Sequence, residues 1–138
     1  MTLLELLLAV SMLGILAALS IPVSTALLAR NDLRLAAVSA SQSIRRAQVL
    51  SQASDADASW GVSVQPEAII LFQGSSFASR NTQFDEITPL SSPISMNGLT
   101  EVVFDRGTGT PQSTGTLTMS NANETTAMTL NAKGMVSD

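Results

Sequence analysis

The sequence predicts an α+β fold, in which a long N-terminal α-helix packs on a small antiparallel β-sheet domain. The first part of the chain has apolar residues at helical spacing. After residue 58 the composition changes to the β-branched residues, Ser, Thr, Asn and Gly that are typical of short strands and turns. The 138 residues leave room for one small domain beyond the helix. We therefore divide the chain into a hydrophobic helix at 1–29, its amphipathic continuation at 30–53 and a β domain at 54–138.

The first segment is long and apolar. Residues 1–29 contain one charged side chain, Glu5, and from residue 3 onward they carry fifteen large aliphatic or Met side chains. The 24 uncharged residues from Leu6 to Ala29 would span about 36 Å as a helix, which is enough to cross a bilayer. Each large apolar side chain gains about 1.5–3 kcal/mol when it leaves water. We expect this segment to form the membrane-spanning half of the helix, lying in lipid or packed against protein.

Glu5 is the one carboxylate in this apolar setting. An ionised group in a medium of low dielectric constant is costly unless it is paired. The cation available within the segment is the α-amino group of Met1. Glu5 can reach the amine of its own chain, or that of a neighbouring copy when helices bundle in register. A position at the membrane interface, with no role in assembly, is the plain alternative.

These residues resemble a known N-terminus. Met1–Leu6 (MTLLEL), the apolar run through Gly14 and the pair Ile21-Pro22 are similar to the mature start of type IV pilins and of the related type II secretion pseudopilins. The resemblance implies that prepilin peptidase has removed a leader before Met1, and that Met1 is the cleavage and methylation site. It implies that Met1 and Glu5 govern assembly, since the carboxylate pairs with a neighbouring subunit's amine.

Proline inside a helix removes one backbone hydrogen bond and clashes with the preceding turn, so we expect a kink or local melting at Pro22. An ordinary membrane-helix kink would explain it equally well. The resemblance favours a helix hinge from Gly14 to Pro22 that unwinds in the assembled filament.

The helix is expected to continue beyond the apolar segment, with a narrow stripe on one face. The stripe has spacings of three and four, and acidic residues after position 54 end the pattern. We predict that this stripe packs on the β-sheet of the same chain. Its residues are Leu33, Ala36, Ala37, Ala40, Ile44, Ala47 and Leu50.

The β domain should begin with a hairpin. Large apolar residues alternate with small or polar ones along residues 60–64, and residues 68–72 form a short apolar run. We therefore predict two strands joined by a turn at residues 65–67. Residues 73–98 are rich in Gly, Pro and Ser, which predicts mainly loop.

Three later strands are predicted, at 101–105, 115–120 and 127–131, with Gly- and Asn-rich turns between them. Residues 102–107, 115–120 and 128–136 are similar to the C-terminal strands of the GspH/FimT-like branch of pilin-like proteins. With the N-terminal segment, this resemblance covers most of the chain.

Several kinds of chemistry are excluded by composition. The chain has no His and no Cys, which excludes Cys/His zinc sites, thiol nucleophiles and a Ser-His-Asp triad. We therefore predict a protein that is not an enzyme and has no cofactor. Asp85 and Glu86 could help to ligate calcium, but we favour a solvated loop. Asn123 fits the glycosylation pattern, which arises often by chance, and Lys133, the only lysine, is expected to be a surface charge.

Charge is distributed unevenly along the chain. Residues 1–53 hold four arginines against two acids, a formal +2, while residues 54–138 hold nine acids against three bases, a formal −6. An acidic domain disfavours nucleic-acid capture, which needs clustered Lys and Arg. Arg30 and Arg34, just past the apolar run, are expected to meet lipid headgroups before assembly or acidic neighbours afterwards.

Taken together, the residues and the resemblance favour a structural pilin subunit. It would polymerise through its N-terminal helix into a homo-oligomeric, type IV pilus-like helical filament with an adhesion or motility role. The expected partners are the inner membrane, the pilus assembly machinery and prepilin peptidase. The chain would lie in the inner membrane before assembly and in the extracellular filament afterwards. Two alternatives stay open: a low-copy minor pilin or type II secretion pseudopilin, and a monomeric membrane-anchored extracytoplasmic binding domain.

Overall fold

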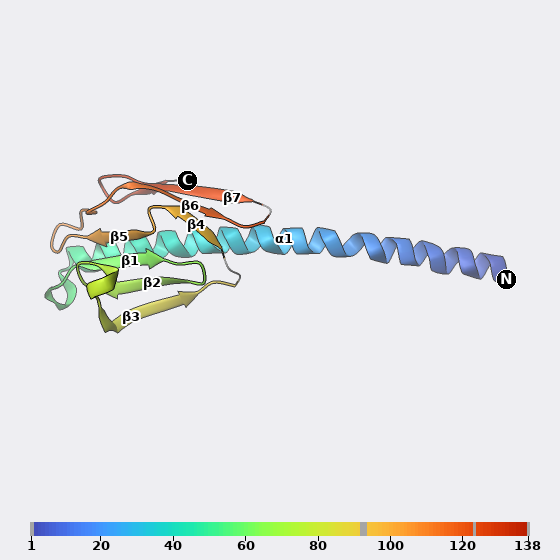
Figure 1. The fold of residues 1–138 in the computed structure, drawn as a ribbon, viewed down its shortest axis with the longest axis horizontal. Helices are drawn as coiled ribbons and strands as arrows, with labels where there is room; N and C mark the ends of the chain where they lie inside the picture. Colours follow the sequence, from blue (N-terminus) through green and yellow to red (C-terminus); the bar gives the residue numbers. More distant parts are fainter. Residues whose placement is uncertain (1, 92–93, 123, 138) are drawn as a thin grey trace.

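The computed structural model describes residues 2–91, 94–122 and 124–137, with the side chains of residues 19–26 left out. Within these residues one long helix, α1 (Leu3–Gln52), precedes a set of antiparallel strands. Figure 1 shows the first half of α1 projecting away from the strands, which gather around its second half. The predicted α+β fold with a long N-terminal helix and antiparallel sheet is confirmed.

Helix α1 is continuous over 50 residues. In the part of the chain that the structure describes, however, no helical segment combines the length and the apolar character needed to cross a membrane. The membrane-spanning part of the predicted fold class is therefore not supported.

The helix ends where the sequence predicts. The Ala53 N–H donates to the Val49 carbonyl oxygen, 2.9 Å away, and the next residue, Ser54, adopts a left-handed conformation with φ 51°. A left-handed residue just past the last turn is a common helix stop. A short 3₁₀ turn, η1 (Asp55–Asp57), follows, and the chain then enters the first strand.

The strands form two four-stranded antiparallel sheets, with orders β3-β2-β1-β5 and β4-β6-β7-β8. The single small sheet of the prediction is therefore wrong. After β3 the chain enters the second sheet through β4, returns to the first as β5, and ends in the second. The strands are β1 (Trp60–Val64), β2 (Ala68–Gln73), β3 (Asn81–Pro89), β4 (Ser95–Gly98), β5 (Glu101–Phe104), β6 (Gly115–Ser120), β7 (Thr125–Leu130) and β8 (Val136–Ser137).

The predicted hairpin is present. β1 and β2 pair antiparallel from Trp60 opposite Gln73 to Val64 opposite Ile69, and residues 65–67 make the turn. The later predicted strands correspond to β5, β6 and β7, and β7 begins two residues earlier than predicted.

The loop predicted for residues 73–98 is wrong, because this region holds β3 and β4 as well as the short turn η2 (Phe77–Ser79). β3 is an edge strand, and most of its side chains are exposed. An edge strand is held by backbone hydrogen bonds to one neighbour, so its side chains need not show apolar alternation. Asp85 and Glu86 consequently lie in a strand and not in a solvated loop.

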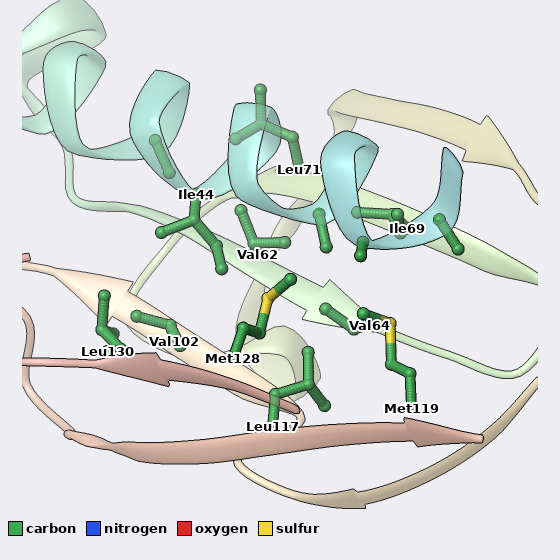
Figure 2. Packing of buried hydrophobic residues seen from close by; sticks show 14 of the residues in the cluster. Ile44, Val62, Val64, Ile69, Leu71, Val102, Leu117, Met119, Met128 and Leu130 are labelled. Carbon is green, nitrogen blue, oxygen red and sulfur yellow. The ribbon is translucent and has the colours of Figure 1, made fainter. Parts of the chain in front are cut away.

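The core lies between α1 and both sheets. Figure 2 shows Ile44 pointing from the helix toward the strand side chains Val62 and Met128. Val62 belongs to the first sheet and Met128 to the second, so one helix face joins the two sheets. The space left between Ile44 and the strands amounts to only about 10 Å³, too little for a ligand.

A buried hydroxyl joins the end of the helix to the first sheet. The Ser51 side chain is fully buried, its Oγ accepts a hydrogen bond from the Trp60 N–H (2.9 Å), and it donates to the Phe104 carbonyl oxygen (3.2 Å). The Ser51 carbonyl oxygen accepts from the Gly107 N–H at 2.7 Å. These bonds fix the helix end against β1, β5 and the loop after β5.

A second small apolar layer covers the far face of the first sheet. The Phe72 and Phe77 rings meet edge to face with centroids 5.6 Å apart, and the Arg80 guanidinium lies 3.8 Å from the Phe77 centroid. Arg80 Nε also pairs with Asp85 Oδ2 at 2.8 Å. Both partners of this ion pair are largely shielded from water, since their side chains are 23% and 10% exposed.

Candidate functional site

The start of the helix is organised by Glu5 and Thr2. The Glu5 N–H donates to Thr2 Oγ1 at 3.4 Å, and the Thr2 N–H donates to Glu5 Oε2 at 3.3 Å. This reciprocal pair is a capping box, which satisfies backbone donors that the first helical turn leaves free. Sequence reasoning missed this second use of Glu5, although the Thr-x-x-Glu spacing is its signature. Met1, the proposed partner of Glu5, lies outside the described residues.

The described part of the projecting helix exposes large apolar side chains on all sides. Their exposed fractions run from 55% for Leu6 to 80% for Leu3. A soluble monomer rarely exposes so large a contiguous apolar surface. The side chains concerned are Leu3, Leu4, Leu6, Leu7, Leu8, Val10, Met12, Leu13, Ile15 and Leu16.

The backbone of α1 stays helical through the predicted hinge. Both Gly14 and Pro22 lie within the continuous helix, so no local melting is present in this single copy. The Pro22 side chain lies outside the described residues. At Gly14 an added Cβ would meet no atom within 4 Å. A hinge that acts in an assembled filament stays a prediction.

The residues predicted to pack on the sheet lie in the core. Six of the seven are buried, and Leu50 is partly buried against the same cluster. Their neighbours come from both sheets, and Figure 2 shows how closely the helix approaches the strands. The six buried positions are Leu33, Ala36, Ala37, Ala40, Ile44 and Ala47.

A basic groove runs along the side of α1 that faces the β6–β7 turn. We use this name for the open groove of about 780 Å³ whose helix wall carries Arg30, Arg34 and Arg45 and whose strand wall carries Glu124 and Thr126. Arg30 Nε pairs with Glu124 Oε1 at 2.9 Å. Arg34 and Arg45 are exposed, and neither forms an ion pair with any residue that the structure describes.

Sequence analysis singled out Arg30 and Arg34 but not Arg45. The signal was present, because residues eleven apart on a helix are separated by about three full turns and share a face. Arg46, the next residue along, points elsewhere and pairs through Nη1 with Glu86 Oε1 at 2.9 Å. The second wall of the groove was not predictable, since Glu124 and Thr126 lie 79 to 96 positions away in the sequence from the arginines of the helix wall.

The remaining sequence candidates lie outside this groove. Asp85 and Glu86 each have an arginine partner, and no cluster of metal-ligating side chains occurs among the described residues. Lys133 is exposed, and its carbonyl oxygen accepts from Gln48 Nε2 at 2.9 Å. Asn123 lies outside the described residues.

Comparisons with protein-family models, with curated protein sequences and with solved structures find no match to this chain. The functional argument therefore rests on three features of the molecule itself. They are the uncovered apolar half of α1, the capped carboxylate at its start and the basic groove beside its second half.

Proposed function

We propose that this chain is a structural subunit of a type IV pilus-like helical filament and polymerises through its N-terminal helix. One observation carries the proposal: the first half of a 50-residue helix stands apart from the strands, and its described large apolar side chains are 55% to 80% exposed. Removing each such side chain from water is worth about 1.5–3 kcal/mol. Bundling with the same segment of other copies would remove all of them at once.

In this proposal the function is assembly, without catalysis and without a cofactor. The apolar half of α1 forms the filament core, and the acidic β domain, held by the second half of α1, coats the surface. Before assembly the apolar half lies in the inner membrane, where prepilin peptidase and the assembly machinery act on it. After assembly the subunit lies in an extracellular filament with an adhesion or motility role.

The capping box fits a double role for Glu5. One carboxylate oxygen, Oε2, accepts from the Thr2 N–H of its own chain. A carboxylate has further acceptor positions on its second oxygen, and the proposal assigns these to the Met1 amine of a neighbouring subunit. The negative charge of Glu5 also suits the positive end of the helix dipole.

Three variants test this role. Glu5→Gln keeps a side chain that can complete the capping box but removes the charge, whereas Thr2→Ala removes half of the box and keeps the charge. If charge pairing drives assembly, Glu5→Gln and Glu5→Ala both give a folded protein with little sheared filament, while Thr2→Ala gives nearly the normal yield. Filament yield is measured by quantitative mass spectrometry of the sheared fraction against total protein. A normal yield from Glu5→Gln would refute the assembly role of the charge.

The same measurement separates major from minor subunits. A chain that dominates the sheared filaments is the major pilin, and a trace amount beside another dominant subunit indicates a minor pilin or pseudopilin.

The basic groove favours one second candidate, a monomeric membrane-anchored extracytoplasmic binding domain that holds an anionic ligand. That function predicts no filament and no effect of Glu5→Gln, and it is therefore distinguishable in the same experiment.

A further inference from the structure

The basic groove carries positive charge that has no acidic partner among the described residues. Arg34 and Arg45 are exposed and lie on its helix wall. Neither is neutralised by a described acidic group, in contrast to Arg30, which Glu124 holds at 2.9 Å. About 16 Å separates the two residues along the helix axis. The groove thus presents an extended basic surface rather than a single charge.

An acidic segment lies just past the C-terminal end of α1. The turn η1 is formed by Asp55, Ala56 and Asp57, and none of the three is buried. The Asp57 side chain is 88% exposed and pairs with Arg106 at the surface. Ser54, Ala56 and Asp57 all have φ between 51° and 56°, a left-handed conformation that is unfavourable for residues other than glycine. The turn therefore presents both carboxylates at the surface, with that of Asp57 paired to Arg106.

We infer that the basic groove of one copy receives the η1 turn of a second copy, with Arg34 and Arg45 facing Asp55 and Asp57. Arg34 and the η1 turn cannot meet within one chain, because Arg34 lies about 27 Å from the end of α1 along the helix axis. Two different surfaces that join head to tail generate an open helical assembly when the rotation between copies does not close into a ring. This inference rests on the proposed filament and names a contact, between the second half of α1 in one copy and the η1 turn of the next, that sets its register.

Electrostatic complementarity favours this occupant. The helical part of the chain carries a formal +2 and the remainder a formal −6, so the domains of like copies repel unless opposite patches are brought together. Patches of opposite sign steer encounter and fix register more than they add affinity. The apolar bundle would supply the affinity, and the groove would select the axial offset between copies.

Charge reversal tests the pairing. Arg34→Glu and Asp55→Arg should each lower the yield of sheared filament about tenfold, because each places like charges together. The double variant Arg34→Glu/Asp55→Arg restores opposite charges at every contact and should recover most of the yield. If Asp55→Arg fails to rescue Arg34→Glu, the groove serves another anion, such as a lipid phosphate, and the inference is overturned.

The absence of cysteine from the chain permits a direct test of contact. The double variant Arg34→Cys/Asp55→Cys should give a disulfide-linked ladder of oligomers in oxidised filaments and membranes, while each single variant gives dimers at most. Arg46→Cys/Asp55→Cys is the matched control, because Arg46 is on the same helix but pairs with Glu86 outside the groove. A ladder from the control equal to that from the groove variant would overturn the inference.

The two proposals fail differently. Filaments that depend on Glu5 but give no ladder from Arg34→Cys/Asp55→Cys overturn the groove contact and leave the proposed function standing. If there are neither filaments nor ladder in any variant, both are overturned.

Discussion

Replacing Ser51 with alanine should weaken the junction between helix and sheet. The Ser51 side chain is fully buried, and its Oγ lies 2.9 Å from the Trp60 nitrogen and 3.2 Å from the Phe104 carbonyl oxygen. Alanine at this position removes the acceptor for one buried N–H and the donor to one buried carbonyl. Both groups belong to the strands that meet the end of the helix.

The expected loss follows from these two bonds. A buried N–H left without an acceptor costs about 1–3 kcal/mol, and the lost bond to the carbonyl adds about 0.5–1.5 kcal/mol. Alanine recovers roughly 0.5 kcal/mol through its higher helix propensity. We expect Ser51→Ala to lower the free energy of unfolding by about 1–4 kcal/mol. This is a large share of the 5–15 kcal/mol typical of a whole domain.

Trp60 is the only tryptophan and is 5% exposed at this junction, so its fluorescence reports the transition directly. Urea titration of the detergent-solubilised full chain gives the free energy of unfolding by linear extrapolation. Ser43→Ala is the control, because Ser43 is half-buried on the same helix and shares the gain in helix propensity. Equal stability of the two variants would refute the assigned role of the Ser51 hydroxyl.

Two further pairs of variants test other contacts. In the urea titration, Arg80→Ala should lower the free energy of unfolding by about 1–3 kcal/mol, because it leaves the shielded Asp85 carboxylate unpaired. Arg46→Ala breaks an ion pair in which both side chains are at least half exposed, so it should cost less than about 1 kcal/mol. Equal losses in the two variants would contradict this expectation. Gly98→Ala should destabilise the folded protein more than Gly107→Ala. Both glycines have positive φ, but of the two only Gly98 would place an added Cβ against a backbone carbonyl oxygen of β6. Thermal melts followed by circular dichroism would show the difference, and equal midpoints would argue against the clash.

The elements that the sequence predicted well are those with strong local signals. The helix boundary after Gln52 coincides with acidic turn residues, and the 60–72 hairpin combines alternation, a short apolar run and a Pro-containing turn. β3 was missed because an edge strand is stabilised by backbone pairing to β2, which leaves no periodic apolar signal. The short β4 was missed because four residues are too few to show a recognisable alternation of apolar and polar side chains.

Some features of the candidate site were likewise predictable from the sequence, and others were not. Glu5 stood out because it is an isolated charge in an apolar run, whereas its bond to Thr2 was missed although the Thr-x-x-Glu spacing indicates it. Arg34 and Arg45 share a helix face by spacing alone, but the groove exists only because the β6–β7 turn lies beside that face.

The sequence by itself determined the long helix, its apolar first half, its stripe for the sheet and the absence of Cys and His chemistry, because each depends on residue type and on spacing along one element. Only the tertiary structure decided that the strands divide into two sheets, that one helix face joins them and that basic and acidic surfaces lie at different places along the molecule. Those features depend on contacts between residues far apart in the chain, and local periodicity carries no information about which distant segments will meet.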